Sequence, residues 1–123
     1  MAFEWSHYID LAEELNSATA TDAKMRTAIS RAYYGVFCIC RRKKDMHLVY
    51  YEHIHKEVVK RYKESENSCE YTIGNILDGL RKKRIEADYT AIYPITWQQT
   101  KIDINQARSI INLFERIEAG ECD

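Results

Sequence analysis

Proline and glycine, the residues that most often interrupt regular secondary structure, are scarce in this chain. Its 123 residues include one proline, Pro94, and four glycines. Folds rich in β-strands need such residues at their frequent turns, so their scarcity argues against a sheet architecture and favours long helices. The length is that of one compact unit, and we expect a single domain over residues 1–123.

Long apolar runs are also lacking. The longest uncharged apolar stretch, Ala32–Cys40, falls far below the roughly 20 residues that a helix needs to cross a bilayer. The first residues show no basic segment followed by an apolar one, so no secretory signal is expected. These absences predict a cytoplasmic protein that does not enter a membrane.

The chain has no excess of charge of one sign. Lys and Arg total 18 against 19 Asp and Glu, a formal net charge of -1. Contact with nucleic acid therefore requires a local basic patch. One candidate is Arg41–Lys44, four basic residues at the expected end of a helix. Cations there also complement the negative end of the helix dipole, so a structural role and a phosphate-contacting role both remain open.

Cysteines are few, and their spacing matches neither a disulfide framework nor a zinc site. Cys38 and Cys40 lie two apart in a helical segment, so their side chains point about 200° from each other. We expect these two, Cys69 and Cys122 to be reduced thiols in or near the core. Gly-rich phosphate loops, the Gly-x-Ser-x-Gly elbow and His-Glu-x-x-His are absent too, which excludes several enzyme classes. No metal or cofactor is expected.

Five segments carry apolar residues at steps of three and four, the spacing of one helical face. The strongest stripe begins at Met25 and continues to Cys40. Thr96 and Gln99 have the spacing of a capping box that opens a last helix. The expected helices cover residues 3–16, about 25–44, 51–64, about 73 until Pro94 stops it, and 97–117. They predict an all-α, antiparallel up-and-down bundle of four to five helices.

Arg84 departs from the binary pattern of its helix. It follows Ile73, Leu77 and Leu80 at helical spacing, so its side chain turns toward the apolar face. A buried guanidinium needs a partner, and Asp88, four residues on, can supply a charge-assisted hydrogen bond. An ion pair that fixes the register of the bundle and a site for phosphate or RNA are both consistent with this placement.

Further polar residues join this candidate site. Arg31 and Tyr34 share one face of the second helix, where Arg31 can face either Arg84 or a partner chain. Histidine carries protons near neutral pH, and His55 is a candidate for that role. Arg42 and His47 are spaced so that both can reach one phosphate.

Two motifs in this order resemble the HEPN domain superfamily, in its small stand-alone branch. They are Ala28–Phe37, which reads AISRAYYGVF, and Arg84-x-x-Ala87-Asp88-Tyr89, with His55 and Val58 between them. The resemblance spans roughly residues 8–117. It implies an α-helical bundle, commonly a homodimer, often encoded beside a minimal nucleotidyltransferase or within toxin-antitoxin and antiphage defence systems.

Catalytic members of that superfamily use an arginine followed a few residues later by a histidine, and the paired copies in a dimer cleave RNA without a metal. This sequence has Tyr89 where that histidine is expected, and tyrosine, with a pKa of about 10, is a poorer base at neutral pH. Cleavage would then depend on the arginine and on positioning of the substrate, or would draw on His55 from another helix. The resemblance and the residue pattern together give Arg84, Asp88, Tyr89 and His55 as the catalytic group, and Arg31, Tyr34, Arg42 and His47 as substrate-binding residues.

Three functions stay open at this point. The first is a homodimeric, metal-independent ribonuclease of a toxin-antitoxin or antiphage system. The second is a non-catalytic module that binds a nucleotidyltransferase or another effector subunit, with the polar cluster serving as structure or as a modified tyrosine site. The third, a nucleotide sensor, rests only on the basic run at residues 41–44.

Overall fold

The computed structural model describes residues 2–123, and over this range the chain is helical with no strand. The all-α prediction is therefore confirmed. In chain order the elements are α1 (His7–Leu15), α2 (Asp22–Lys43), the short 3-10 helix η1 (Met46–Leu48), α3 (Ile54–Lys63), α4 (Ser68–Tyr89) and α5 (Trp97–Glu118). None of the helices in residues 2–123 combines the length and apolar character needed to span a membrane.

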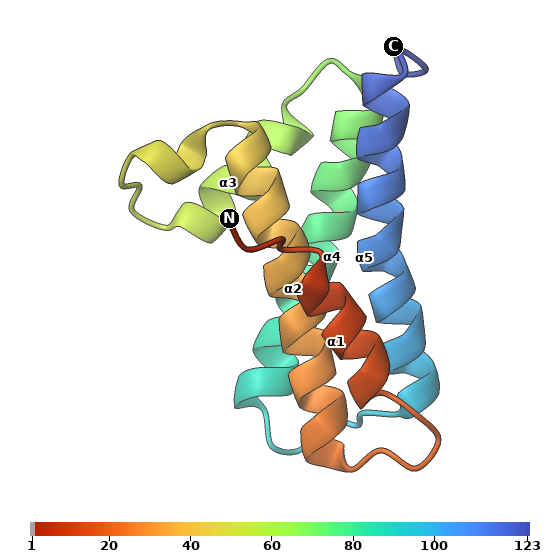
Figure 1. Cartoon of the computed structure of the whole chain (residues 1–123). Helices are drawn as coiled ribbons and strands as arrows, with labels where there is room; N and C mark the ends of the chain where they lie inside the picture. The colour runs from red at the N-terminus through yellow and green to blue at the C-terminus, as the bar shows by residue number, and fades with distance from the viewer. Residues whose placement is uncertain (1) are drawn as a thin grey trace.

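The long helices α2, α4 and α5 lie side by side with alternating directions, and α1 lies against α2 (Figure 1). The α1–α2 and α4–α5 connections meet at one end of the molecule. At the other end η1 and α3 project to one side, and α3 packs on α4. Helix α2 contacts α1, α3, α4 and α5, so its side chains occupy the centre of the core.

The core is formed by the apolar stripes of these helices. Tyr33, Tyr62, Leu77, Ile104 and Ile110 are among its fully or almost fully buried side chains. Burial of such side chains contributes roughly 1.5–3 kcal/mol each, which makes this stripe packing the main stabilising term. The hydroxyl of Tyr62 donates to the carbonyl oxygen of Cys40 at 2.7 Å, so its polar end is satisfied inside the core.

Three long helices begin with a side-chain cap. The backbone N–H of the residue three positions on donates to the capping oxygen in each case, from Lys24 to Thr21, from Glu70 to Asn67 and from Gln99 to Thr96. The last of these confirms the predicted start of α5. The reciprocal half of that capping box is not made, because the Gln99 side chain donates to Asp103 instead, at 3.1 Å.

Two helices are shorter than the apolar pattern predicts. Residues 3–6 precede α1, and its fully buried positions are Ile9 and Ala12, with Tyr8 only half-buried. Helix α3 begins at Ile54 and not at Tyr51. The predictions for these ends were wrong because short helices have few turns over which an apolar stripe can define a boundary.

Helix α4 ends at Tyr89, well before Pro94, because Arg26 of α2 binds its end. The Arg26 guanidinium donates to carbonyl oxygens that the helix cannot satisfy itself, with distances between 2.9 and 3.2 Å. The acceptors are Ala87, Thr90, Ala91 and Tyr93. Asp22 pairs with the same guanidinium and so neutralises it. These hydrogen bonds from Arg26 take the place of the glycine cap that often ends a helix, and they fix the last turn of α4.

The expectation of four reduced cysteines is wrong for two of them. Cys69 and Cys122 form a disulfide with a Cα–Cα distance of 5.8 Å, whereas Cys38 and Cys40 are free. Because α4 and α5 run antiparallel, the start of α4 lies beside the residues that follow α5. The N–H of Ser68 also donates to the carbonyl of Asp123 at 2.7 Å, which closes the same end of the molecule.

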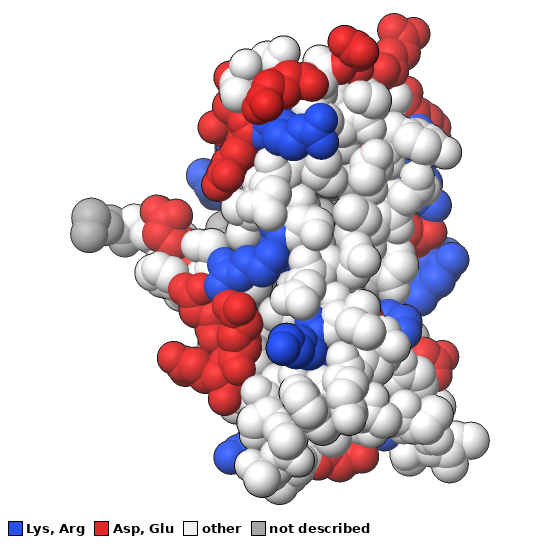
Figure 2. All heavy atoms as spheres, turned by 90° about the vertical axis from the view of Figure 1, so that its right-hand side faces the viewer, with Lys and Arg blue, Asp and Glu red and all other residues white. Residues whose placement is uncertain are grey.

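The face on which α5 lies carries no continuous basic surface. Figure 2 shows a broad uncharged band in the middle of this face, with acidic side chains gathered at its left border and upper end. Lys and Arg occur there as separate spots.

Candidate functional site

Three helices bring the candidate residues together. Helix α2 contributes Tyr33 and Tyr34, α3 contributes His55, and α4 contributes Arg84. The close approach of α3 to α4 depends on Gly74. A Cβ atom there would lie 2.7 Å from the backbone nitrogen of Lys63, so any larger residue would push the end of α3 outward.

Arg84 is buried as its register predicts, with 7% of its surface exposed. Its guanidinium carbon lies over two aromatic rings, 5.4 Å from the centre of Tyr33 and 5.2 Å from that of Tyr34. Cation–π contacts in a desolvated position are worth roughly 2 kcal/mol or more, which offsets part of the cost of burying the charge. The two tyrosines therefore hold the guanidinium in place between α2 and α4.

Asp88 is the charged partner of Arg84. One of its carboxylate oxygens lies 3.6 Å from Nη1 of Arg84 and accepts a hydrogen bond from the hydroxyl of Ser30 at 3.3 Å. The Nε atom of Arg84 is buried and has no hydrogen-bond partner within residues 2–123. The pairing of the Arg84 guanidinium within residues 2–123 is thus incomplete.

His55 is held by aromatic contacts and one hydrogen bond. Its Nδ1 lies 2.7 Å from the hydroxyl oxygen of Tyr33, and its ring stacks on Phe37 with centres 4.2 Å apart. Burial, followed by the positive charges of nearby arginines, lowers the pKa of His55 below its ordinary value of 6.5. The imidazole is therefore neutral at pH 7. Because Nδ1 is engaged, Nε2 is the nitrogen left for another partner.

His55 and Arg84 line one open pocket of about 210 Å³. This is several times the roughly 30 Å³ that a water molecule occupies in the liquid. The pocket is lined by cationic or imidazole side chains and one apolar residue, namely His53, His55, Lys56, Arg81, Arg84 and Ile85. No carboxylate lines it, although Asp78 pairs with Arg81 at 3.0 Å. The lining favours an anion of the size of a phosphate group.

Arg31 and Tyr34 lie beside this pocket. The Arg31 guanidinium carbon is 5.3 Å from the centre of the Tyr34 ring, and Arg84 approaches the same ring. Arg31 also lies over Tyr8 of α1, at 4.8 Å. Both arginines therefore lie near the ring of Tyr34.

Three of the residues predicted for the site lie apart from the Arg84–His55 pocket. Tyr89 is 76% exposed and lines a different hollow at the end of α4, together with Arg26 and Asp88. Arg42 is exposed at the far end of α2 and lines another pocket. His47 belongs to η1 and is half-buried there. The expected grouping of these three with Arg84 is not found.

Sequence reasoning missed several residues that the structure places in or beside the site, and three of them hold or extend its charged groups. Tyr33 holds both Arg84 and His55, Ser30 bonds to Asp88, and Arg81 lines the pocket. Ser30 and Tyr33 lie in the AISRAYYGVF motif, and Arg81 is one helical turn before Arg84. Helical spacing was the signal that could have found Arg81.

Comparison of this chain with models of protein families, with curated proteins and with solved structures finds no match. The interpretation of the site therefore rests on its own geometry. Within residues 2–123 no group of three His, Cys, Asp or Glu side chains is arranged to hold a metal ion.

Proposed function

We propose that the chain is an HEPN-like, metal-independent ribonuclease that acts as a homodimer in the cytoplasm, within a toxin-antitoxin or antiphage defence system. The observation that supports the chemistry is the pocket in which a neutral His55 and an incompletely paired Arg84 meet without a lining carboxylate. An RNA phosphodiester supplies the anion that this pocket favours. It also carries its own nucleophile, the neighbouring ribose 2′-hydroxyl.

In the proposed reaction, Nδ1–H of His55 donates to the Tyr33 oxygen, and Nε2 takes the proton of the 2′-hydroxyl. The 2′-oxygen bonds to phosphorus, and the bond from phosphorus to the 5′-oxygen breaks. That oxygen leaves with a proton from water, and the other product carries a 2′,3′-cyclic phosphate. Arg84 and Arg81 stabilise the negative charge that builds up on the phosphoryl oxygens.

The proposal of a homodimer rests on exposed apolar side chains along and after α4. Ile85 lines the pocket and is 36% exposed, and Tyr89 and Ile92 on and after the end of α4 are 76% and 91% exposed. Exposed large apolar side chains of this kind are typical of a protein interface. A second copy seated there would narrow the pocket and exclude water from it.

The direct test is incubation of the purified protein with labelled single-stranded RNA in the presence of a chelator. We expect cleavage to products with cyclic phosphate ends, and about a hundredfold slower cleavage by His55→Gln. Intact RNA after long incubation with the dimeric protein, at any pH between about 5 and 8, would refute the ribonuclease proposal.

A second candidate is favoured by one observation. The Arg84 side chain is only 9% exposed and is covered by two tyrosine rings, as a structural ion pair would be. In that case the chain is a non-catalytic HEPN-like module that binds a nucleotidyltransferase or another effector subunit, and the exposed Tyr89 belongs to that contact. Stable co-purification with the product of a neighbouring gene, without RNA cleavage, distinguishes this candidate.

A further inference from the structure

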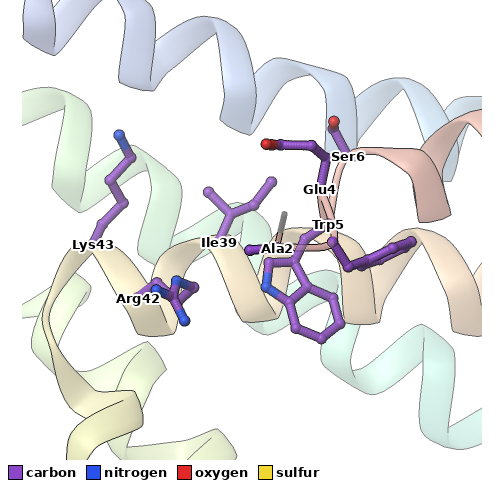
Figure 3. Close-up of a pocket in the computed structure, with 8 residues that line it drawn as sticks. Ala2, Glu4, Trp5, Ser6, Ile39, Arg42 and Lys43 are labelled. Atoms are coloured by element: carbon purple, nitrogen blue, oxygen red, sulfur yellow. The ribbon is translucent and has the colours of Figure 1, made fainter.

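A second pocket lies between the N-terminal segment and the last third of α2. Its volume is about 540 Å³, and its lining combines aromatic, aliphatic and charged residues, namely Ala2, Phe3, Glu4, Trp5, Ser6, Ile39, Arg42 and Lys43. None of these residues takes part in the chemistry proposed for the Arg84–His55 pocket. Figure 3 shows Ile39 between the basic end of α2 and the N-terminal segment.

The charged side chains of this pocket divide between two sides. In Figure 3, Glu4 and Lys43 extend toward α5, whereas Trp5 and Arg42 lie on the other side of the α2 ribbon. Lys43 is engaged in an ion pair with Glu118 at 2.9 Å. Arg42 is exposed and forms no ion pair with any residue of the range 2–123. The pocket lining therefore includes both the indole of Trp5 and the guanidinium of Arg42, and Arg42 has no charged partner in the range 2–123.

Aromatic rings continue from this pocket toward the Arg84 site. The ring centre of Phe3 lies 5.2 Å from that of Trp5 and 5.0 Å from that of Tyr8. Arg31 then lies over Tyr8 and over Tyr34, and Tyr34 also contacts Arg84. A continuous row of aromatic rings and arginines therefore runs from one pocket to the other. We call this row, Phe3–Tyr8–Arg31–Tyr34, the connecting row.

We propose that the N-terminal pocket is a base-binding subsite for single-stranded RNA, in which Trp5 stacks on a base and Arg42 binds an adjacent phosphate. The connecting row carries the strand between this subsite and the Arg84–His55 pocket. This inference rests on the proposed ribonuclease function and adds the form of the substrate to it.

The chemistry of the lining selects a single strand. A ring can stack on a base only when that base is free of its neighbours, and bases in a duplex are already stacked and paired. Arg42 lies eight residues beyond Tyr34 on α2, which corresponds to about 12 Å along the helix axis. A strand of several nucleotides can therefore extend from the Tyr34 end of this segment to Arg42.

The test uses intrinsic fluorescence, since Trp5 and Trp97 are the two tryptophans of the chain. In a Trp97→Phe variant the emission reports on Trp5 alone. Single-stranded oligouridylate long enough to span both pockets should quench it, and a duplex of the same length should not. Trp5→Ala should weaken binding of the oligonucleotide about tenfold in fluorescence anisotropy.

Two variants and one control test whether binding depends on stacking at Trp5 and on the charge of Arg42, and not on the net charge of the protein. Trp5→Phe keeps an aromatic ring and should retain most of the affinity. Arg42→Gln should weaken oligonucleotide binding several-fold, whereas Arg116→Gln, which removes the same charge from the last turn of α5, should not. Circular dichroism of each variant checks that it is folded.

The outcomes also distinguish this inference from the function on which it rests. Binding of the oligonucleotide with no quenching of Trp5, and with equal affinity for Trp5→Ala, would overturn the base-binding subsite and leave the ribonuclease proposal standing. Equal binding of the duplex would overturn the preference for a single strand. Absence of any binding of the single-stranded oligonucleotide would overturn both proposals.

Discussion

Nδ1 of His55 and the hydroxyl oxygen of Tyr33 lie 2.7 Å apart, so a core residue of α2 sets the orientation of the one imidazole that faces Arg84 from α3. The ring is held further by its stack on Phe37. Nδ1 of this imidazole is therefore bound to the protein, and Nε2 is the nitrogen that can exchange a proton with a substrate.

The pH dependence of RNA cleavage follows from the lowered pKa of His55. The base form of the imidazole is active, so the rate should rise with pH and reach half of its maximum below pH 6.5, the ordinary pKa. Single-turnover rates measured from about pH 4.5 to 8 give the profile. A rate that still rises steeply above pH 6.5 would mean that another group is the base.

Arg26 is predicted to be a major stabilising residue. Arg26→Ala leaves several carbonyl oxygens at the end of α4 without donors, and we expect a loss of about 2–3 kcal/mol in the free energy of unfolding. Urea denaturation measures it. Arg116→Ala, on the exposed last turn of α5, is the matched control and should change stability by less than about 0.5 kcal/mol. An equal loss of unfolding free energy in the two variants would contradict the stabilising role assigned to Arg26 at the end of α4.

The disulfide should contribute to stability through the loop it closes. Cys69 and Cys122 are 53 residues apart, for which the loop-entropy relation gives about 4 kcal/mol. Denaturation with and without a reducing agent should differ by up to that amount, and Cys69→Ser should be insensitive to the agent. Identical curves for the wild type under both conditions would show that the bond does not form in solution.

The proposed homodimer makes a specific prediction for the exposed side chains of α4. Ile85→Glu combined with Ile92→Glu places two charges on the expected interface and should convert the dimer to a monomer in light scattering. Leu11→Glu, at an exposed position of α1, is the control and should leave the dimer intact. A wild-type protein that is monomeric at all concentrations would remove the basis for this interface.

Sequence patterns predicted those features that depend on helical register. The inward position of Arg84, its proximity to Asp88 and the start of α5 at Thr96 all follow from spacing along one helix. Tyr89 shows the limit of the same reasoning, because motif order placed it in the site while one further step around the helix turns it to solvent.

Features that depend on distant segments could not be read from spacing. Arg26 finds its carbonyl partners more than 60 residues away, and Cys69 finds Cys122 only because α4 and α5 run antiparallel. The aromatic contact between Tyr8 and Arg31 likewise requires the packing of α1 on α2. Pairings of this kind are decided by the tertiary arrangement.

Replacement of Arg84 by methionine tests the central claim most directly, because it keeps the apolar volume between Tyr33 and Tyr34 and removes the charge. We expect Arg84→Met to unfold within about 1.5 kcal/mol of the wild type, since well-packed apolar residues often substitute for a buried ion. Its RNA cleavage should fall about a hundredfold, while Lys82→Met, an exposed position on the same helix, should cleave normally. A folded Arg84→Met protein that cleaves RNA at the wild-type rate would contradict the assignment of Arg84 to the phosphate.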